Sequence, residues 1–186
     1  MLPPAAQEVF WKALAHPAPG PPLEVFAVLD GGRVQELQNY PAKWDEDVPF
    51  ACLLAGESDP LELMRAPYLV RVVRGSNTAR WLLSDAWDKS CGVFLACAAG
   101  TELDTVLQDI REVLDARLPD GRLVKFRFYD PRIWRPFFPT CDAGQLKVLF
   151  GRAVKAFGCE DAGGGALLLD TRDLGEPRRV PYTMPL

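Results

Sequence analysis

Residues 121–151, GRLVKFRFYDPRIWRPFFPTCDAGQLKVLFG, decide the fold prediction for this chain. They hold the densest cluster of aromatic residues and arginines in the sequence. Residues 123–129 alternate in character, which predicts a strand with Val124, Phe126 and Phe128 on one face. The alternation indicates that one face of this strand packs against a core while the other carries Lys, Arg and Tyr side chains.

Two helix-start signals follow the predicted strand. Asp130 can cap a helix that begins at Pro131, because its carboxylate accepts backbone N–H groups and proline has no N–H to satisfy. Asp142 starts a second helix, and Gln145, three residues later, supplies the other half of a capping box. Gly151 is placed to end that helix. The stretch therefore predicts a strand followed by two helices.

The rest of the chain also alternates between predicted strands and helices. Apolar runs predict strands over residues 24–30, 50–54, 68–73 and 92–98. Helical spacing predicts helices over residues 4–15, over residues 34–40, from Asn77 for about three turns, and from Thr101 with an apolar stripe that ends at Leu114. Loop or broken helix is predicted for residues 60–67, and an acidic loop for residues 44–48. Residues 24–30 are almost continuously apolar, which favours a central position in the sheet.

These elements predict an α/β fold in which a mixed β-sheet is flanked by helices within a single compact domain. Residues 1–22 are an N-terminal helix and a proline-rich connector, and residues 23–151 are the α/β domain. Residues 152–186 are a short C-terminal extension of the same globule. Its two apolar runs, 154–159 and 166–171, could pair as a β-hairpin, and an extended tail follows from Glu176.

Composition narrows the class of protein. At 186 residues, with 48% hydrophobic and 25% charged residues, the chain fits one globular domain. No apolar run reaches the length of a bilayer span and no secretory signal is visible, so we expect a cytoplasmic protein without membrane insertion. Five cysteines without a C-x-x-C pair, together with one histidine, predict reduced thiols and no metal site. We expect no cofactor.

Charge is unevenly distributed along the sequence. Residues 1–66 contain ten acidic and four basic residues, whereas residues 121–135 contain five basic residues and one acidic residue. Such polarity suits a protein partner with its own charge pattern. The basic segment is too small, in a chain of net charge −4, to predict nucleic-acid binding.

The enzymatic alternative is a metal-dependent hydrolase. Asp30, Asp130 and Asp170 each end a predicted strand, and such carboxylates could hold a divalent cation. Each also has a structural explanation, since Asp30 begins a turn, Asp130 caps a helix and Asp170 precedes a loop. A cysteine nucleophile paired with His16 has less support, because no cysteine lies in a recognisable catalytic context. The sequence therefore favours a protein that is not an enzyme, with no catalytic residue assigned.

Arg127 lies among aromatic residues in the middle of the predicted strand. Its burial would require a partner such as Asp130, Asp30 or a set of carbonyl groups. It could pin the strand to the following helix, or it could be offered to the carboxylate of a protein partner. The sequence leaves both interpretations open.

Residues 126–132, FRFYDPR, followed by Gln145-Leu146 and Phe150-Gly151, resemble the signature of the type VI secretion effector-adaptor family, first catalogued as a domain of unknown function. Further segments match in order: residues 27–32, 49–54, 66–70 and 92–95. The resemblance covers roughly residues 24–151.

The resemblance implies an adaptor, or effector chaperone, that binds a cognate toxic effector in the producing cell. It further implies that the adaptor helps to load the effector onto the spike, with the spike tip protein as a second candidate partner. Many relatives add a sizeable variable C-terminal lobe, of which only residues 152–186 could correspond here. The candidate partner-binding residues are Arg127, Tyr129, Asp130, Arg132, Trp134 and Arg135.

Overall fold

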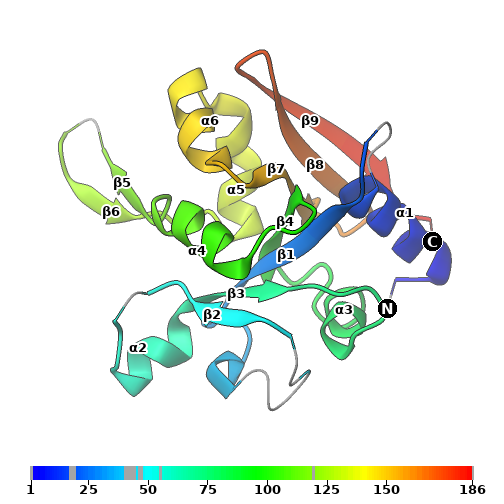
Figure 1. The fold of residues 1–186 in the computed structure, drawn as a ribbon, viewed down its shortest axis with the longest axis horizontal. Coiled ribbons are helices and arrows are strands. Elements are labelled where there is room, and N and C mark those ends of the chain that lie inside the picture. Colours follow the sequence, from blue (N-terminus) through cyan, green and yellow to red (C-terminus); the bar gives the residue numbers. More distant parts are fainter. Residues whose placement is uncertain are drawn as a thin grey trace.

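The chain folds around a seven-stranded sheet (Figure 1). The computed structural model describes residues 2–16, 20–39, 45, 48–54, 56–118 and 120–185. The strands of the main sheet, in spatial order, are β2 (Phe50–Cys52), β3 (Pro67–Arg71), β1 (Leu23–Asp30), β4 (Gly92–Ala98), β7 (Val154–Glu160), β8 (Ala166–Asp173) and β9 (Glu176–Thr183). Each pairing between neighbours is antiparallel. A separate two-stranded ribbon consists of β5 (Asp115–Arg117) and β6 (Leu123–Lys125).

Helices cover both faces of the sheet. They are α1 (Pro4–Ala15), α2 (Pro60–Arg65), α3 (Asn77–Leu82), α4 (Leu103–Arg111), α5 (Pro131–Phe137) and α6 (Ala143–Phe150), with short 3₁₀ turns at Leu37–Asn39 and Phe138–Thr140. One apolar core joins α1 and α3 to the sheet, and the other joins α4, α5 and α6 to its opposite face. The predicted α/β class, with helices flanking a sheet in one compact domain, is confirmed, but the seven-stranded sheet is antiparallel throughout and not mixed as predicted.

β1 lies inside the sheet, between β3 and β4, as its apolar sequence predicts. Its side chains alternate between the two cores: Ala27 and Leu29 enter the α1 core, whereas Phe26 and Val28 enter the α4–α6 core. A strand buried on both faces needs apolar residues at every position, which explains the unbroken run.

Both helix starts in residues 121–151 are confirmed. The Asp130 carboxylate accepts the Arg132 N–H at 3.0 Å, at the start of α5. At the start of α6, the Asp142 carboxylate accepts the Gln145 N–H at 2.8 Å, and the Gln145 side chain accepts the Asp142 N–H at 2.9 Å. Gly151 then ends α6 with a φ of 47°, a value that glycine adopts without a steric penalty.

The predicted strand over residues 123–129 is wrong in length and in partner. β6 ends at Lys125 and pairs with β5 outside the main sheet. The last ladder bond runs from the Phe126 N–H to the Leu114 carbonyl, after which the Asp130 N–H bonds to the Arg127 carbonyl and turns the chain. The predicted alternation holds as far as Phe128, but Tyr129, expected on the exposed face, is buried, because a tight turn replaces the second half of the strand.

Other predicted boundaries also need correction. α3 is capped by the Ser76 hydroxyl rather than by Asn77, and it ends at Leu82. Glu102, not Thr101, precedes α4. Residues 60–67 contain α2, and only Leu37–Asn39 is helical within residues 34–40. The predicted acidic loop, residues 44–48, lies mostly outside the described residues.

The C-terminal segment supplies three strands of the main sheet. β7 and β8 pair as predicted, and the tail expected to be extended forms the edge strand β9. The Met184 N–H bonds to the Gly165 carbonyl, so even-numbered residues of this ladder face β8. Pro177 and Pro181 therefore face the free edge, where proline is tolerated because no ladder donor is required there.

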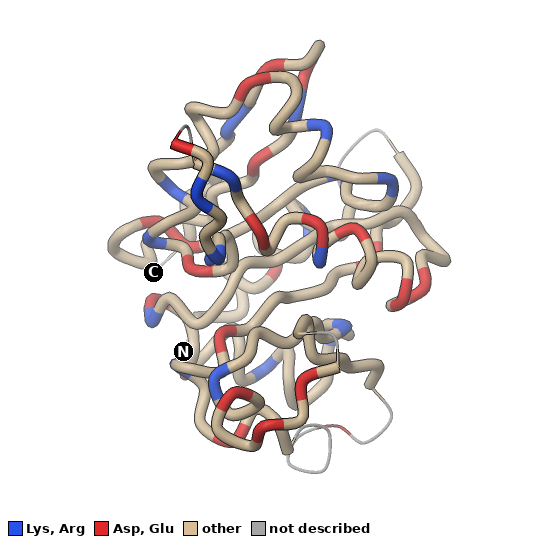
Figure 2. The backbone as a smooth tube through the Cα atoms, turned by 90° about the vertical axis from the view of Figure 1, so that its left-hand side faces the viewer, with Lys and Arg blue, Asp and Glu red and all other residues tan. Residues whose placement is uncertain are grey.

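Charged residues of both signs are spread over the tube in Figure 2. Arg127, from the basic segment, pairs with Asp30, from the acidic segment, so the two segments meet at this point of the fold. The described helices are all too short or too polar to cross a membrane.

Candidate functional site

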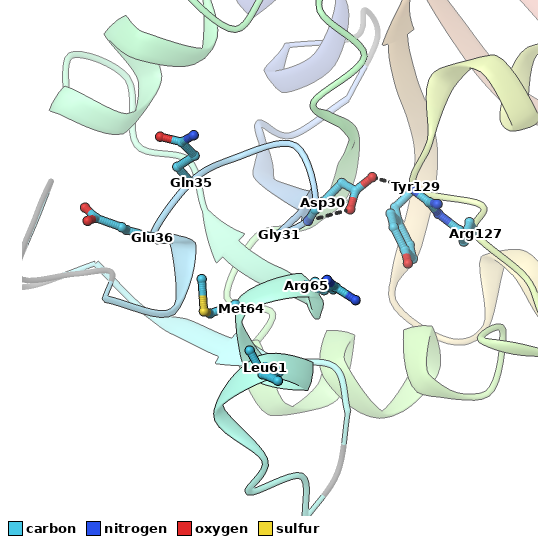
Figure 3. Close-up of a pocket in the computed structure, with 10 residues that line it drawn as sticks. Asp30, Gly31, Gln35, Glu36, Leu61, Met64, Arg65, Arg127 and Tyr129 are labelled. Atoms are coloured by element: carbon cyan, nitrogen blue, oxygen red, sulfur yellow. Dashed lines mark hydrogen bonds and ion pairs between the residues drawn. The ribbon is translucent and has the colours of Figure 1, made fainter.

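An open cleft of about 670 Å³ lies at the end of β1 (Figure 3). We call it the corner cleft. It is lined by Asp30, Gly31, Gly32, Gln35, Glu36, Leu61, Met64, Arg65, Arg127 and Tyr129. Leu61, Met64 and Arg65 come from α2, whereas Arg127 and Tyr129 come from the turn before α5. The cleft thus joins segments almost 100 residues apart in the sequence.

The close approach of two loops builds one wall of the corner cleft. The Gly31 N–H donates to the Ala66 carbonyl at 3.0 Å, which ties the loop after β1 to the junction of α2 and β3. A Cβ atom on Gly31 would lie 2.4 Å from the Ala66 oxygen, so only glycine fits this contact. The segments that carry the family resemblance, residues 27–32 and 66–70, therefore meet here.

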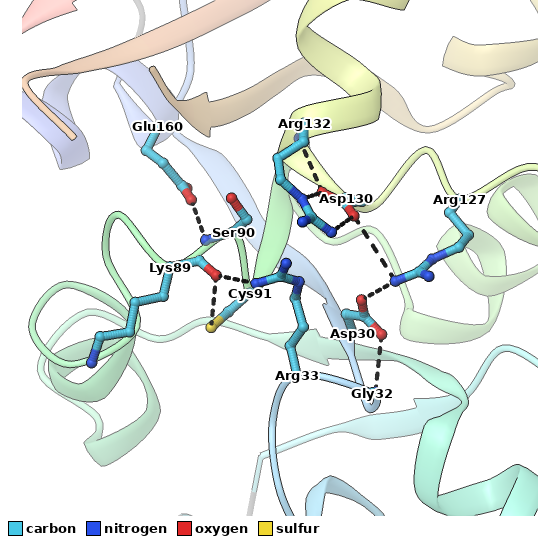
Figure 4. Close-up of polar contacts among 10 residues, drawn as sticks. All are labelled: Asp30, Gly32, Arg33, Lys89, Ser90, Cys91, Arg127, Asp130, Arg132 and Glu160. Atoms are coloured by element: carbon cyan, nitrogen blue, oxygen red, sulfur yellow. Dashed lines mark hydrogen bonds and ion pairs between the residues drawn. The ribbon is translucent and has the colours of Figure 1, made fainter. Parts of the chain in front are cut away.

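A chain of ion pairs crosses the corner (Figure 4). Arg127 Nη2 lies 2.5 Å from Asp30 Oδ2 and 3.9 Å from Asp130 Oδ2. Arg132 donates two hydrogen bonds to the Asp130 carboxylate, from Nε to Oδ1 at 3.0 Å and from Nη2 to Oδ2 at 2.6 Å. Each aspartate side chain is only 2% exposed, whereas the arginine side chains are 46% and 53% exposed. The corner therefore buries the carboxylates of Asp30 and Asp130 and leaves the guanidinium groups of Arg127 and Arg132 partly exposed to solvent.

This arrangement combines the two interpretations of Arg127. The residue pins the turn before α5 to β1 through Asp30, and nearly half of its side chain still faces the cleft. Its guanidinium carbon lies 5.9 Å from the centre of the Tyr129 ring, which limits the orientations that Arg127 can adopt. Arg127 is thus held in place and has N–H groups directed to solvent.

The electrostatic environment fixes the protonation states of the corner. Burial acts to raise the pKa of Asp130, but the hydrogen bonds from Arg132 outweigh it and the pKa falls below its ordinary value. Burial raises the pKa of Tyr129, with a further contribution from the charge of Asp30. At neutral pH the corner therefore holds an ionised Asp130 and a neutral Tyr129 phenol.

The α2 wall of the cleft is apolar and exposed. Leu61 and Met64 are 64% and 47% exposed, and no residue of α2 is buried. The helix is held at its start by the Asp59 carboxylate, which accepts the Leu61 N–H at 2.8 Å, and near its end by the Tyr68 hydroxyl, which donates to the Leu63 carbonyl. Apolar side chains in a fixed position beside cationic ones form a surface suited to binding a protein segment.

The sequence analysis does not include Leu61, Met64 and Arg65 among the site residues, because it predicts loop or broken helix for residues 60–67. The signal was present, since Asp59-Pro60 is the same helix-start pair as Asp130-Pro131. An apolar helix without a buried residue can be recognised only once the packing is known.

A second open hollow of about 500 Å³ lies beside Arg132, which binds Asp130 at the corner. Its lining includes Arg33, Lys89 and Arg132, and Arg33 Nη1 donates to the Lys89 carbonyl at 2.9 Å. Figure 4 shows Arg33 and Arg132 on the two sides of this part of the corner. The cationic surface is therefore wider than the corner cleft itself.

Two of the predicted contact residues belong elsewhere. Trp134 is fully buried, and its Nε1 donates to Asp170 Oδ2 at 2.7 Å, so it cannot touch a partner. Arg135 Nη1 donates to the carbonyls of Glu160 and Asp161, at 3.0 and 3.1 Å, and so fastens α5 to the end of β7. We therefore correct the assignment of Trp134, which supports the fold, whereas Arg135 is half-buried and its contact with a partner stays a prediction. Asp130 is buried as well, and it orients Arg132.

The three carboxylates of the hydrolase alternative do not form one site. Asp170 lies within β8, not at its end, and Arg179 holds both of its oxygens at 2.6 Å. Asp30 and Asp130 are bound to arginines at the corner. Within the described residues no three His, Cys, Asp or Glu side chains converge as metal ligands would. The geometry thus favours structural roles for these carboxylates.

The fold and the site define a three-layer α/β protein whose signature segments meet at one open cleft. A family model described as a domain of unknown function, DUF4123, matches residues 25–147, about two thirds of the chain. The protein belongs to this family. The match contains every residue that lines the corner cleft and stops before β7. No curated protein and no solved structure matches the chain.

Proposed function

We propose that this protein is an adaptor that binds a secreted type VI effector in the cytoplasm of the producing cell and helps to load it onto the spike. The adaptor acts by stoichiometric binding and not as an enzyme. It covers an apolar segment of the effector at the corner cleft, and the spike tip protein is a further candidate partner. The resemblance of residues 24–151 to the effector-adaptor family supports this role.

The observation that carries the proposal is where the signature segments meet. Residues of 27–32 and 126–132 line an exposed cleft that combines apolar and cationic side chains, and Ala66, of residues 66–70, is bonded to Gly31 in its wall. Leu61 and Met64 would contact apolar side chains of the effector, and Arg65 and Arg127 would bind its carboxylates. Asp30 and Asp130 are engaged with arginines, which supports binding over catalysis.

The test is a capture experiment with surface variants of α2. Leu61→Asp and Met64→Asp place charge on the apolar wall without disturbing the core, because both side chains are exposed. Leu174→Asp is the matched control, since Leu174 is fully exposed in the turn between β8 and β9 and lies outside the corner cleft. Each tagged protein is expressed in cells that produce the secretion apparatus, and the co-purified proteins are quantified by mass spectrometry and by a sizing column.

We expect wild type and Leu174→Asp to recover one large toxin-like protein in fixed stoichiometry. Each α2 variant should recover it at least about tenfold less, since losing an anchoring apolar contact at the centre of an interface costs more than about 1.4 kcal/mol. Equal recovery by all four proteins would reject the corner cleft as the binding site. Recovery of no specific protein by wild type would reject the adaptor function.

A further inference from the structure

A second groove, of about 480 Å³, lies between the β5–β6 ribbon and α6. We call it the hairpin groove. Its lining residues are Glu112, Val113, Asp115, Ala116, Arg117, Phe126, Phe137, Asp142, Gly144, Gln145, Val148 and Leu149. All three residues of β5 line it, whereas none of the residues of β6 does. β5 therefore forms one wall of the groove and α6 the other, and Figure 1 shows the ribbon standing out from the body of the protein beside α6.

The free edge of β5 carries unpaired backbone groups. The Phe126 N–H bonds to the Leu114 carbonyl and the Leu118 N–H bonds to the Arg122 carbonyl, so even-numbered residues of β5 face β6. The N–H and C=O groups of Asp115 and Arg117 consequently point away from β6. An exposed strand edge of this kind is a template for a further strand. Two strands alone are also marginally stable, and a third would stabilise the ribbon.

The edges of the main sheet are less accessible to a third strand. At β9, Pro177 and Pro181 occupy outward positions and remove two donors. At β2, the outward carbonyl of Cys52 already accepts a hydrogen bond from Arg111 Nη2 at 2.9 Å. Among the strand edges that the structure describes, that of β5 combines outward backbone groups with an adjoining groove.

The side chains around the groove indicate the composition of its occupant. The floor is apolar, with Val113, Phe126, Phe137 and Leu149 buried or half-buried and Val148 half exposed. The rim carries three acidic residues, Glu112, Asp115 and Asp142, against Arg117. Lys125 on β6 pairs with Asp115 at 2.7 Å, but both side chains are exposed and this pair can exchange partners. Apolar side chains between basic ones would complement this surface.

We propose that the hairpin groove binds an extended segment of a partner protein, with alternating apolar and basic residues, as a third strand on β5. The backbone of the segment pairs with Asp115 and Arg117, its apolar side chains cover the groove floor, and its Lys or Arg residues meet the acidic rim. This surface is distinct from the corner cleft, because the two share no lining residue. The proposal stands whether or not the client of the corner cleft is a secreted effector.

Two synthetic peptides with labelled N-termini are the probes: Val-Arg-Val-Arg-Val-Arg-Val amide and the same peptide with Glu in place of Arg. Binding to the full chain is followed by fluorescence anisotropy. Arg117→Pro removes an outward N–H from the β5 edge, and Leu123→Pro removes the equivalent outward N–H from the far edge, on β6. Because Arg117→Pro also removes a positive charge from the rim, charge alone would strengthen binding of the basic peptide. A loss of affinity for the basic peptide in Arg117→Pro would therefore be due to the missing N–H at the β5 edge and not to the change in charge.

We expect the basic peptide to bind at least about tenfold tighter than the acidic one. Arg117→Pro should weaken binding of the basic peptide about tenfold, whereas Leu123→Pro should change it less than about twofold. Hydrogen exchange should slow at the Asp115 and Arg117 amides when the basic peptide is added. Equal affinity for both peptides, no detectable binding of either, or equal effects of the two proline variants would each overturn the proposal. Concentration-dependent dimers in light scattering that Arg117→Pro abolishes would overturn it too, because a second copy would then occupy the edge.

Discussion

The corner cleft and the hairpin groove lie at opposite ends of α5, and they differ in how they are built. α5 starts at Asp130, beside the corner cleft, and ends at Phe137, which lines the hairpin groove. The turn before α5 also contributes to both surfaces, since Phe126 lines the hairpin groove and Arg127 lines the corner cleft. At the end of the main sheet, the cleft is supported by ion pairs between buried aspartates and partly exposed arginines. One wall of the groove, in contrast, is an exposed two-stranded ribbon.

This difference separates two ways of presenting a binding surface. At the corner, the turn that carries Arg127 is bonded to β1 through Asp30, so the cationic groups are in position before a partner arrives. At the groove, the unpaired edge of β5 becomes a paired strand only when a partner supplies the third strand. Mutations of the residues that support the corner should therefore lower both stability and client binding, whereas a mutation at the β5 edge should lower peptide binding alone.

The largest loss of stability is expected in α5, the helix that supports both surfaces. Trp134→Ala empties the fully buried site that holds α5 against Phe157 and leaves Asp170 without one of its donors. We expect a loss of about 4 kcal/mol in the free energy of unfolding, measured by urea denaturation. Peptide binding to the groove and client binding to the cleft should fall together. Loss at one surface only would show that α5 does not couple them.

A smaller effect is expected where only the corner is disturbed. Gly31→Ala sets a methyl group 2.4 Å from the Ala66 carbonyl oxygen and forces the loop after β1 away from α2. We expect a loss of about 2 kcal/mol, with weaker client capture and unchanged peptide binding at the hairpin groove. Gly163→Ala is the control, because nothing lies within 4 Å of its Cβ position. Similar stabilities for the two variants would show that the close contact at Gly31 can relax.

Acid should weaken the corner through Asp130. Its folded pKa is lower than the ordinary value of 3.8, so its ion pair contributes stability above pH 3.8 that is lost as the pH falls through the folded pKa. Asp130→Asn keeps a capping side chain but loses the charge, and it should cost about 1 kcal/mol at pH 7 and less below pH 3.8.

Asp109 provides the comparison for this pH dependence. Burial also acts to raise its pKa, and hydrogen bonds from the backbone N–H groups of Arg152 and Ala153 lower it overall. Asp109→Asn should therefore show the same pH trend in denaturation experiments while leaving client capture intact, because Asp109 lies outside the corner cleft. If Asp130→Asn also left capture intact, the ion pair with Arg132 would not matter for binding.

Local signals in the sequence predicted much of the fold. Asp130-Pro131 and the Asp142–Gln145 capping box depend on contacts between neighbours in sequence, and both are confirmed. The unbroken apolar run of β1 correctly predicted its place inside the sheet, since a strand buried on both faces is apolar at every position. The strand at residues 123–129 failed because its second half depends on a distant partner, Asp30. Alternation alone cannot distinguish a strand in the main sheet from a short ribbon that ends in a turn.

The candidate site was predictable only in part. The sequence pointed to Arg127 with Asp30 or Asp130 as its partners, because a guanidinium among aromatic residues requires a carboxylate. It could not show that α2 leaves Leu61 and Met64 exposed, or that Trp134 is buried, because both depend on how helices pack on the sheet. Exposure of apolar side chains is a property of the assembled fold.

The smallest expected effect is the most direct test of whether the two surfaces are independent. Leu61→Asp and Arg117→Pro both change exposed positions, so each should alter the free energy of unfolding by less than about 0.5 kcal/mol. Leu61→Asp should abolish client capture and spare binding of the basic peptide, whereas Arg117→Pro should weaken the peptide and spare client capture. In the double variant each assay should show only the loss of its own single variant, so no coupling energy is expected between the two substitutions, since the surfaces share no lining residue. A coupling energy above about 0.5 kcal/mol would instead mean that one partner spans both surfaces, with α5 lying between its two points of contact.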